Sequence, residues 1–176
     1  MNLRIIIIIS LIFLTELSFG QHTFDIPDFE TKLDTIYDKH DSSFAIGSVV
    51  QNGDFKGHRF GYWKEYYSTG ELKGSGLMLI EKYVQCCFSG PCTQHYSYKI
   101  GNWTYFYKNG SFKAKGTYET QIYNYPTSCR GGYDIIIQKV GSKWEFYDTE
   151  GEEIKKTKEI VNELETFYTS WGKHSG

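Results

Sequence analysis

A motif of aromatic residues and glycines recurs at a nearly fixed spacing, and this repetition constrains the fold more than any other feature of the chain. The motif occupies residues 61–73, returns over 101–113, and occurs in a shorter form over 142–152. The tryptophans of the three copies are 40 and 41 positions apart, and a glycine follows each of them seven residues later. A regular period of this length predicts that one small structural unit is formed several times and stacked on itself.

Each copy of the motif has the residue pattern of a β-hairpin. In the first copy, the odd-numbered residues from Trp63 to Tyr67 share one face of an extended strand, and the even-numbered residues from Tyr62 to Tyr66 share the other. The later glycine of each copy supplies the positive φ that tight hairpin turns require. The positions that define the repeat are Gly61, Trp63, Gly70, Gly101, Trp103, Gly110, Trp144 and Gly151.

Two long insertions separate the copies, over residues 77–100 and 117–140. Each begins and ends on apolar or aromatic residues and carries cysteine at its tip, which is typical of a further hairpin. Since both insertions leave equivalent places in adjacent repeats, we expect them to lie side by side. Aromatic residues make up 18% of the chain and favour strands. The sequence therefore predicts a mainly β fold, a meandering antiparallel sheet of repeat hairpins.

The segments on both sides of the repeats have helical spacing. Between residues 25 and 40 the apolar positions recur three and four residues apart, at Phe29, Leu33, Ile36, Tyr37 and His40. From residue 152 onwards the apolar positions again alternate at three and four, after a capping box formed by Thr149 and Glu152. We expect an N-terminal helix and a C-terminal helix that caps the open end of the sheet.

The first twenty residues have the pattern of a signal peptide. Arg4 provides the positive charge, residues 5–14 are apolar except for Ser10, and the small residues Ser18 and Gly20 stand at the positions that a signal peptidase reads. The apolar run is shorter than the roughly 20 residues needed to cross a membrane. We expect cleavage after Gly20, export to the periplasm or the outside of the cell, and no transmembrane segment in the mature chain.

The charge balance gives no indication of a nucleic-acid partner. Lysine and arginine total 19 and aspartate and glutamate total 21, so the net charge is −2. A chain that binds phosphate backbones through charge needs an excess of basic residues. The sequence also has no phosphate-binding glycine loop, no Ser-His-Asp order and no zinc-protease helix. We therefore predict no catalytic residues, no cofactor and no bound metal.

The four cysteines are Cys86, Cys87, Cys92 and Cys129. An even number of cysteines in an exported chain favours disulfides. Adjacent cysteines point in opposite directions along an extended backbone, so a direct bond between the first two is strained. The hypothesis is that one of these two bonds Cys92 within the first tip and that the other bonds Cys129 in the neighbouring tip.

Two other chemistries remain open at the same residues. Cys92 and His95, together with Cys129 and one of the adjacent cysteines, provide the ligand types of a Cys₃His zinc site. Alternatively, Cys92 is a nucleophile with His95 as its base, which would make the protein a small extracytoplasmic thiol enzyme or redox protein. Both alternatives require thiols that are not oxidised to disulfides.

The repeat unit Gly-x-Trp-x-x-Tyr/Phe-Tyr-x-x-Gly-x-Leu/Phe-Lys resembles the MORN repeat, in the bacterial variant described as the MORN-like or YwqK-like antitoxin family. The matching residues are Gly61, Trp63, Tyr66, Tyr67, Gly70, Leu72 and Lys73, then Gly101, Trp103, Phe106, Tyr107, Gly110, Phe112 and Lys113, and more loosely Trp144, Tyr147 and Gly151. The resemblance implies a meandering antiparallel sheet of stacked hairpins that serves in binding rather than catalysis.

The resulting interpretation is an exported, non-enzymatic MORN-like protein that binds a partner protein or an envelope component. The expected organisation is a signal peptide over 1–20, a helical segment over 21–43, the β-repeat domain over 44–151 and the capping helix over 152–176. The candidate binding face lies opposite the tryptophans and contains Tyr62, Tyr66, Phe106 and Tyr147. The alternative functions are the thiol enzyme and an antitoxin or immunity-type protein.

Overall fold

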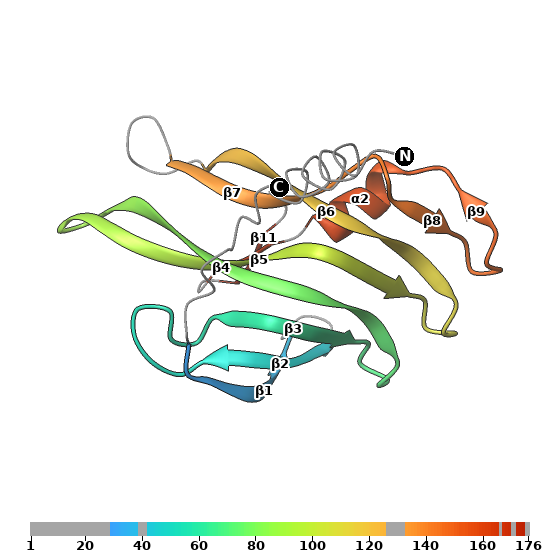
Figure 1. Cartoon of the computed structure of the whole chain (residues 1–176), viewed down its shortest axis with the longest axis horizontal. Helices are drawn as coiled ribbons and strands as arrows, with labels where there is room; N and C mark the ends of the chain where they lie inside the picture. Colours follow the sequence, from blue (N-terminus) through green and yellow to red (C-terminus); the bar gives the residue numbers. More distant parts are fainter. Residues whose placement is uncertain (1–28, 39–41, 126–132, 166, 170–171, 175–176) are drawn as a thin grey trace, which may run out of the picture.

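The computed structural model describes residues 29–38, 42–125, 133–165, 167–169 and 172–174. The described chain is mainly β and forms an antiparallel meander with one short helix (Figure 1). Its elements are β1 (Thr31–Tyr37), β2 (Phe44–Val50), β3 (Arg59–Tyr66), β4 (Leu72–Cys87), β5 (Gly90–Phe106), β6 (Phe112–Tyr125), β7 (Tyr133–Val140), β8 (Glu145–Tyr147), β9 (Glu153–Ile154), α2 (Lys158–Leu164), β10 (Phe167–Thr169) and β11 (Gly172–His174). Neighbours in the sheet follow the order β1-β2-β3-β4-β5-β6-β8-β9, with β7 on β6 and β10 on β5.

The three copies of the motif form three hairpins with the same turn. In each turn, the N–H before the turn donates to the carbonyl after it over 2.9 Å, from Tyr67 to Glu71, from Tyr107 to Ser111 and from Asp148 to Glu152. The turn glycines Gly70, Gly110 and Gly151 have φ of 97°, 86° and 92°. A residue with a side chain is strained at these φ values, so the backbone conformation of the turn explains why glycine recurs at this position.

The two complete hairpins also share a bulge at the same place. Tyr66 pairs with Leu72 and Glu65 with Gly74, which leaves Lys73 as an extra residue. Phe106 and Tyr105 pair in the same way with Phe112 and Ala114, which leaves Lys113 as the extra residue. The lysine that ends the motif is therefore the bulge residue. Because of this extra residue, the side chains before and after the bulge do not follow the simple alternation of a regular strand.

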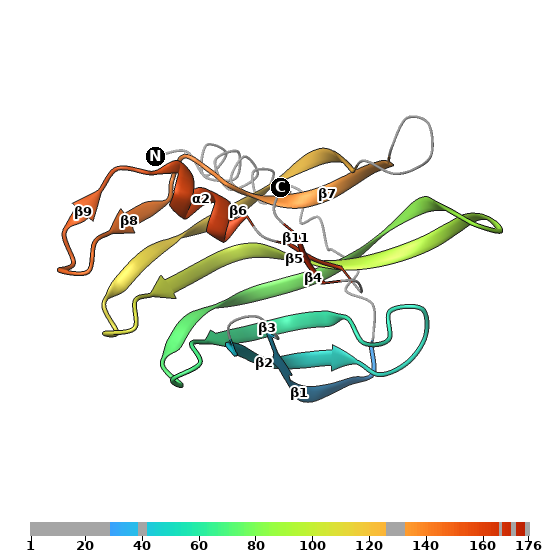
Figure 2. The ribbon, with the colours of Figure 1, turned by 180° about the vertical axis from the view of Figure 1, so that it is seen from behind.

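The two insertions form hairpins, as the sequence predicts. β4 and β5 continue past the repeat as one long arm, and β6 and β7 form a second arm that lies beside it (Figures 1 and 2). A separate cluster of buried residues joins the arms: Tyr83, Tyr96, Tyr98, Ile135 and Ile137. The Ile136 N–H donates to the Tyr96 hydroxyl over 2.9 Å, so a polar contact also joins the two arms.

The predicted N-terminal helix is wrong for the part of it that the structure describes. Residues 31–37 form β1 and pair with β2 along their whole length. The apolar spacing is misleading, because Leu33 and Tyr37 are 70% and 68% exposed and only Ile36 packs against the core. Hydrogen bonds from β2 outweigh the weak helical preference of the segment. The remaining residues of the predicted segment, 21–28 and 39–41, lie outside the described ranges.

The predicted C-terminal helix is much shorter than expected. It spans Lys158–Leu164, and its N-cap is Thr157, whose hydroxyl accepts from the Ile160 N–H, and not the earlier capping box. Residues 153–154 instead complete the third hairpin as β9. After the helix, β10 pairs with β5 at Ser97 and Tyr96. This stretch of β5 has a free edge because β6 leaves β5 after Tyr118 to pair with β7.

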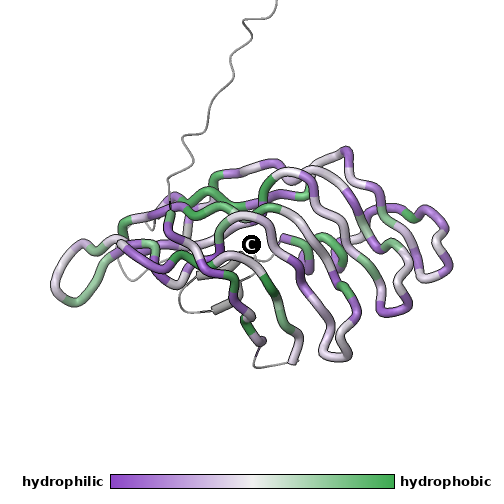
Figure 3. Tube along the Cα trace, turned by 60° about the horizontal axis from the view of Figure 1, so that its bottom comes forward, coloured by the Kyte–Doolittle hydropathy of each residue, from purple (hydrophilic) through white to green (hydrophobic). Residues whose placement is uncertain are grey.

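The main core lies on the tryptophan face of the sheet, where α2 packs (Figure 1). It gathers the three tryptophans with Met78, Tyr105, Tyr118, Val140, Phe146 and Leu164, among others. Hydrophobic residues follow the strands, whereas the tips of the repeat hairpins are hydrophilic or neutral (Figure 3). Within the described ranges, no helix is long and apolar enough to cross a membrane.

Candidate functional site

Each repeat tryptophan lies flat against a glycine of a neighbouring strand. The pairs are Trp63 with Gly47, Trp103 with Gly76, and Trp144 with Gly116. A Cβ added to these glycines would lie 2.3, 2.4 and 2.5 Å from the indole ring, closer than real contacts allow. All three tryptophans are buried. The three tryptophans therefore belong to the core.

The indole N–H groups fix the tryptophans in place. Trp103 Nε1 donates to the Leu77 carbonyl over 3.0 Å, and Trp144 Nε1 donates to the Thr117 carbonyl over 2.9 Å, at the equivalent place one repeat later. Trp63 Nε1 donates to the Phe60 carbonyl over 3.2 Å. Because a buried indole needs a partner for this hydrogen, these bonds leave the rings little freedom to move away from the glycines.

A charged pair is buried in the same core. Lys99 Nζ lies 2.9 Å from a carboxylate oxygen of Glu65, and the two side chains are 3% and 10% exposed. Lys99 also donates to the Tyr105 hydroxyl, which shares a hydrogen bond with the Tyr118 hydroxyl, each over 2.9 Å. Tyr118 in turn donates to the Leu164 carbonyl of α2 over 2.7 Å. A polar chain therefore joins β3, β5 and β6 to the helix.

Burial and charge act in opposite directions on this pair. Burial alone raises the pKa of Glu65, but the charge and the hydrogen bond of Lys99 outweigh it, and the pKa lies below its ordinary value. Burial lowers the pKa of Lys99, and Glu65 offsets part of that effect. A lysine of lowered pKa can serve as a base or nucleophile, but a substrate cannot reach a side chain so deeply buried. The pair therefore belongs to the architecture of the core.

The opposite face of the sheet carries aromatic side chains that remain exposed or half-buried. One residue from each of seven strands forms a stripe across this face near the hairpin turns, which we call the aromatic row: Tyr37, Phe44, Tyr66, Leu72, Phe106, Phe112 and Tyr147. The rings of Phe44 and Tyr66 stack with centroids 4.9 Å apart and planes at 11°. Phe106 stacks on Phe112 at 5.3 Å. Neighbouring rings are therefore in contact over most of the row.

Three of the four residues of the predicted binding face, Tyr66, Phe106 and Tyr147, belong to the aromatic row. The fourth, Tyr62, is on the same face but farther along β3, where it pairs with Leu77. The remaining members were not identified from the sequence. Phe44 and Tyr37 lie before the recognisable repeats, and the bulge places Phe112 on the outer face although Ala114, two residues later, is buried. For Leu72 and Phe112 the signal in the sequence is the lysine that follows each of them, because it forms the bulge.

One end of the aromatic row carries charge. Lys115 Nζ lies 2.9 Å from the Glu145 carboxylate and over the rings of Phe112 and Tyr147, at 5.8 and 5.6 Å from their centroids. The Tyr147 hydroxyl donates to the same carboxylate. This hydrogen bond and the bond from Lys115 lower the pKa of Glu145, while Glu145 raises the pKa of Lys115. The side chains of Lys115 and Glu145 are 44% and 50% exposed, so a partner can rearrange this ion pair.

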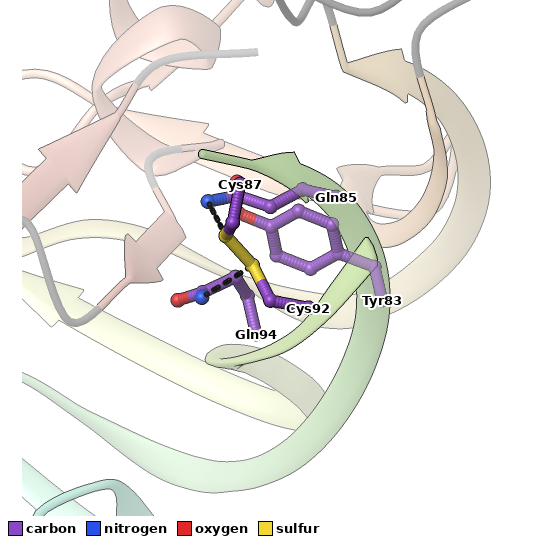
Figure 4. Close-up of a disulfide and its surroundings, with 5 residues drawn as sticks. All are labelled: Tyr83, Gln85, Cys87, Cys92 and Gln94. Atoms are coloured by element: carbon purple, nitrogen blue, oxygen red, sulfur yellow. Dashed lines mark hydrogen bonds between the residues drawn. A yellow bond between two sulfur atoms is a disulfide. The ribbon is translucent and has the colours of Figure 1, made fainter. Parts of the chain in front are cut away.

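The predicted disulfide in the first tip forms between Cys87 and Cys92 (Figure 4). Gln94 Nε2 lies 3.4 Å from the sulfur of Cys92, and Gln85 Nε2 lies 3.9 Å from that of Cys87. Cys86 is also disulfide-bonded. The predicted second partner, Cys129, lies outside the described residues.

The structure does not bring Cys92 and His95 together as a nucleophile and base. The sulfur of Cys92 is bonded to Cys87, and residues three apart in a strand point to opposite faces. The His95 ring contacts Phe55 and His58 instead, with centroids at 4.5 and 5.8 Å. Burial, and then the neighbouring His58, lower the pKa of His95. Among the described residues, no three histidine, cysteine or acidic side chains are placed to hold a metal ion.

No protein-family profile, curated protein sequence or solved structure matches this chain.

Proposed function

We propose that this chain is an exported MORN-like repeat protein without catalytic activity and that it binds a partner protein through the aromatic row. The observation that carries the proposal is the continuous apolar stripe across seven strands on the face opposite the core. Contiguous apolar surface on a soluble protein marks an interaction site far more often than isolated apolar residues do. The charged groups at one end of the row provide the polar rim that such interfaces have.

The orientation of the rings favours a protein over a sugar as the ligand. A sugar binds through its C–H groups against the open face of an aromatic ring. In the aromatic row two pairs of rings turn their faces towards each other: Phe44 stacks on Tyr66 at 11° and Phe106 on Phe112 at 30°. The row therefore presents ring edges and gaps between side chains, which suit the aliphatic and aromatic side chains of a protein.

Removing the exposed rings of the aromatic row should abolish partner binding without unfolding the protein. Tyr37→Ser with Phe112→Ser changes two of its most exposed members. The matched control is Ile122→Ser with Val84→Ser, which removes exposed apolar side chains outside the row. Each protein is cross-linked in the extracytoplasmic fraction of its native cells, and the captured partner is then purified and titrated calorimetrically.

We expect the row variant to lose at least about tenfold in affinity, because a few aromatic residues contribute most of the binding energy of many interfaces. The control variant should bind like the wild type, and all three proteins should have similar melting temperatures. Equal losses in the two variants, or full binding by the row variant, would refute the proposal. So would a wild-type protein that captures no stoichiometric partner.

Export predicts a specific mass for the mature protein. A chain processed after Gly20 should begin at Gln21, and its cysteines should react with a thiol reagent only after reduction. None of the described cysteines is free. The measurement is the intact mass of the native protein before and after reduction and alkylation. A full-length chain that is alkylated without reduction would contradict the export part of the proposal. It would favour the alternative function, an antitoxin or immunity-type protein, acting inside the cell.

A further inference from the structure

Strand β1 is an edge of the sheet. Among the described residues its only neighbour in the sheet is β2, with Thr31 opposite Val50 and Tyr37 opposite Phe44. The strand is seven residues long, and most of its side chains are exposed. An edge of this length presents a row of backbone groups to another strand unless the chain protects it.

The backbone bonds at the two ends of β1 show which of its groups point outwards. Just before the strand, the Glu30 carbonyl accepts from the Gln51 N–H, and just after it, the Asp38 N–H donates to the Ser43 carbonyl. Even-numbered residues therefore turn their backbone groups towards β2, and odd-numbered residues turn theirs away. The outward groups belong to Thr31, Leu33, Thr35 and Tyr37. The Thr35 N–H is held by the carboxylate of its neighbour Asp34 over 2.7 Å.

We propose that β1 pairs antiparallel with β1 of a second copy of this chain, centred on Leu33. In this register Leu33 lies opposite Leu33 of the partner subunit and exchanges two backbone hydrogen bonds with it. Lys32 lies opposite Asp34 of the partner subunit, and symmetry repeats this pair. Thr31 likewise lies opposite Thr35 of the partner subunit, and symmetry repeats this pair. Every cross-strand pair in the centre of the contact is therefore favourable.

Charge selects this register over its closest alternative. Shifting the axis by one residue, to Asp34, would place that carboxylate opposite Asp34 of the partner subunit. Like charges directly opposite each other destabilise an antiparallel pair. The position of Asp34 also fits the proposal, because the carboxylate that covers the Thr35 N–H in one copy becomes free for Lys32 of the partner subunit once the strands pair. The charges of β1 are therefore complementary to those of a second β1, whereas an unrelated strand has no reason to carry the matching charges. This favours a second copy of the chain as the partner.

The contact involves a short strand, so the dimer should be weak. Interfaces of this size belong to transient complexes, with Kd of about the micromolar range or above. The dimer leaves the aromatic row free except at Tyr37, since it forms through backbone groups at the edge and not through the face of the sheet.

Reversal of single charges tests the register directly. Lys32→Glu and Asp34→Lys should each raise the dimer Kd about tenfold or more, because each places two like-charged pairs at the centre. An equal mixture of the two variants should recover the dimer, since the new glutamate at position 32 then faces the new lysine at position 34. Sedimentation equilibrium at protein concentrations up to about millimolar measures the dimer Kd of each variant and of their mixture.

Two further variants keep the test decisive. Leu33→Pro removes an N–H that points away from β2, so the monomer should stay folded while the central pair of the dimer is lost. The control is Lys64→Glu, which makes the same charge change as Lys32→Glu but lies on β3, away from the edge of the sheet. It should leave the dimer Kd unchanged. A wild-type protein that stays monomeric throughout, or a dimer that survives Leu33→Pro and both single reversals, would overturn the proposal.

Discussion

Replacing Gly76 with valine should lower the free energy of unfolding by about 3 kcal/mol, which corresponds to a fall in Tm of about 6–12 °C. A Cβ at this position would lie 2.4 Å from the indole of Trp103. The ring cannot retreat, because it is buried and its N–H is bonded to the Leu77 carbonyl. The backbone of β4 must therefore shift, which strains the pairing of the sheet on both sides. Thermal and urea unfolding followed by tryptophan fluorescence measure the effect.

The equivalent glycine of the next repeat should behave in the same way. Gly116 stands against Trp144 as Gly76 stands against Trp103, so Gly116→Val should have a similar effect. Thr117→Val is the matched control, since this exposed neighbour points to the other face and should change stability by less than about 1 kcal/mol. If either glycine variant melted within about 2 °C of the wild type, the tryptophan–glycine contacts would not hold the core together.

Replacing Lys99 with methionine should lower the free energy of unfolding by about 3–5 kcal/mol, because it removes an ion pair and a hydrogen bond from the buried carboxylate of Glu65. The second variant, Lys99→Met with Glu65→Leu, should recover most of the loss, since an apolar pair of similar volume also removes the buried carboxylate. The control is Lys115→Met, which breaks the exposed pair with Glu145 and should change stability by less than about 1 kcal/mol. Urea unfolding at constant pH gives all three values.

The pH dependence of stability distinguishes the lost charge pair from simple loss of packing. In the wild type the pKa of Glu65 is below its unfolded value, so its contribution is present above the unfolded pKa and is lost as pH falls through the folded pKa. In Lys99→Met the charge that lowers the pKa of Glu65 most is gone, and burial is opposed only by the smaller effects of Arg59 and Lys73, so this pKa should be higher than in the wild type. The variant should therefore regain stability relative to the wild type as pH is lowered. A constant difference across the acid range would show that the charge of Glu65 is not the cause.

Part of the candidate site could be predicted from the sequence because its determinants are local. A hairpin turn needs glycine at a fixed position, and alternation along one strand assigns Tyr66 and Phe106 to the face opposite the tryptophans. The same alternation places Glu65 beside Trp63 on the buried face, which is a signal of a buried carboxylate. Its partner Lys99 is 34 residues away, and no local pattern links the two.

The rest of the aromatic row depends on register, which local rules do not supply. The bulge between Tyr105 and Phe106 moves Phe112 to the outer face, where it stacks on Phe106. Strict alternation from the buried Ala114 would have placed Phe112 in the core. Phe44 and Tyr37 join the row only because β1 and β2 add to the sheet beside β3.

The sequence by itself determined the hairpin units and their turns, and it predicted a disulfide within the first tip without deciding between Cys86 and Cys87. Each of these depends on a few neighbouring residues whose φ values, alternation or spacing allow one local structure. Only the tertiary structure decided that residues 31–37 form a strand and that β10 occupies the edge of β5 left free by β6. Both segments take their conformation from hydrogen bonds with other strands, β2 and β5, and such bonds outweigh a local preference of a few tenths of a kcal/mol per residue.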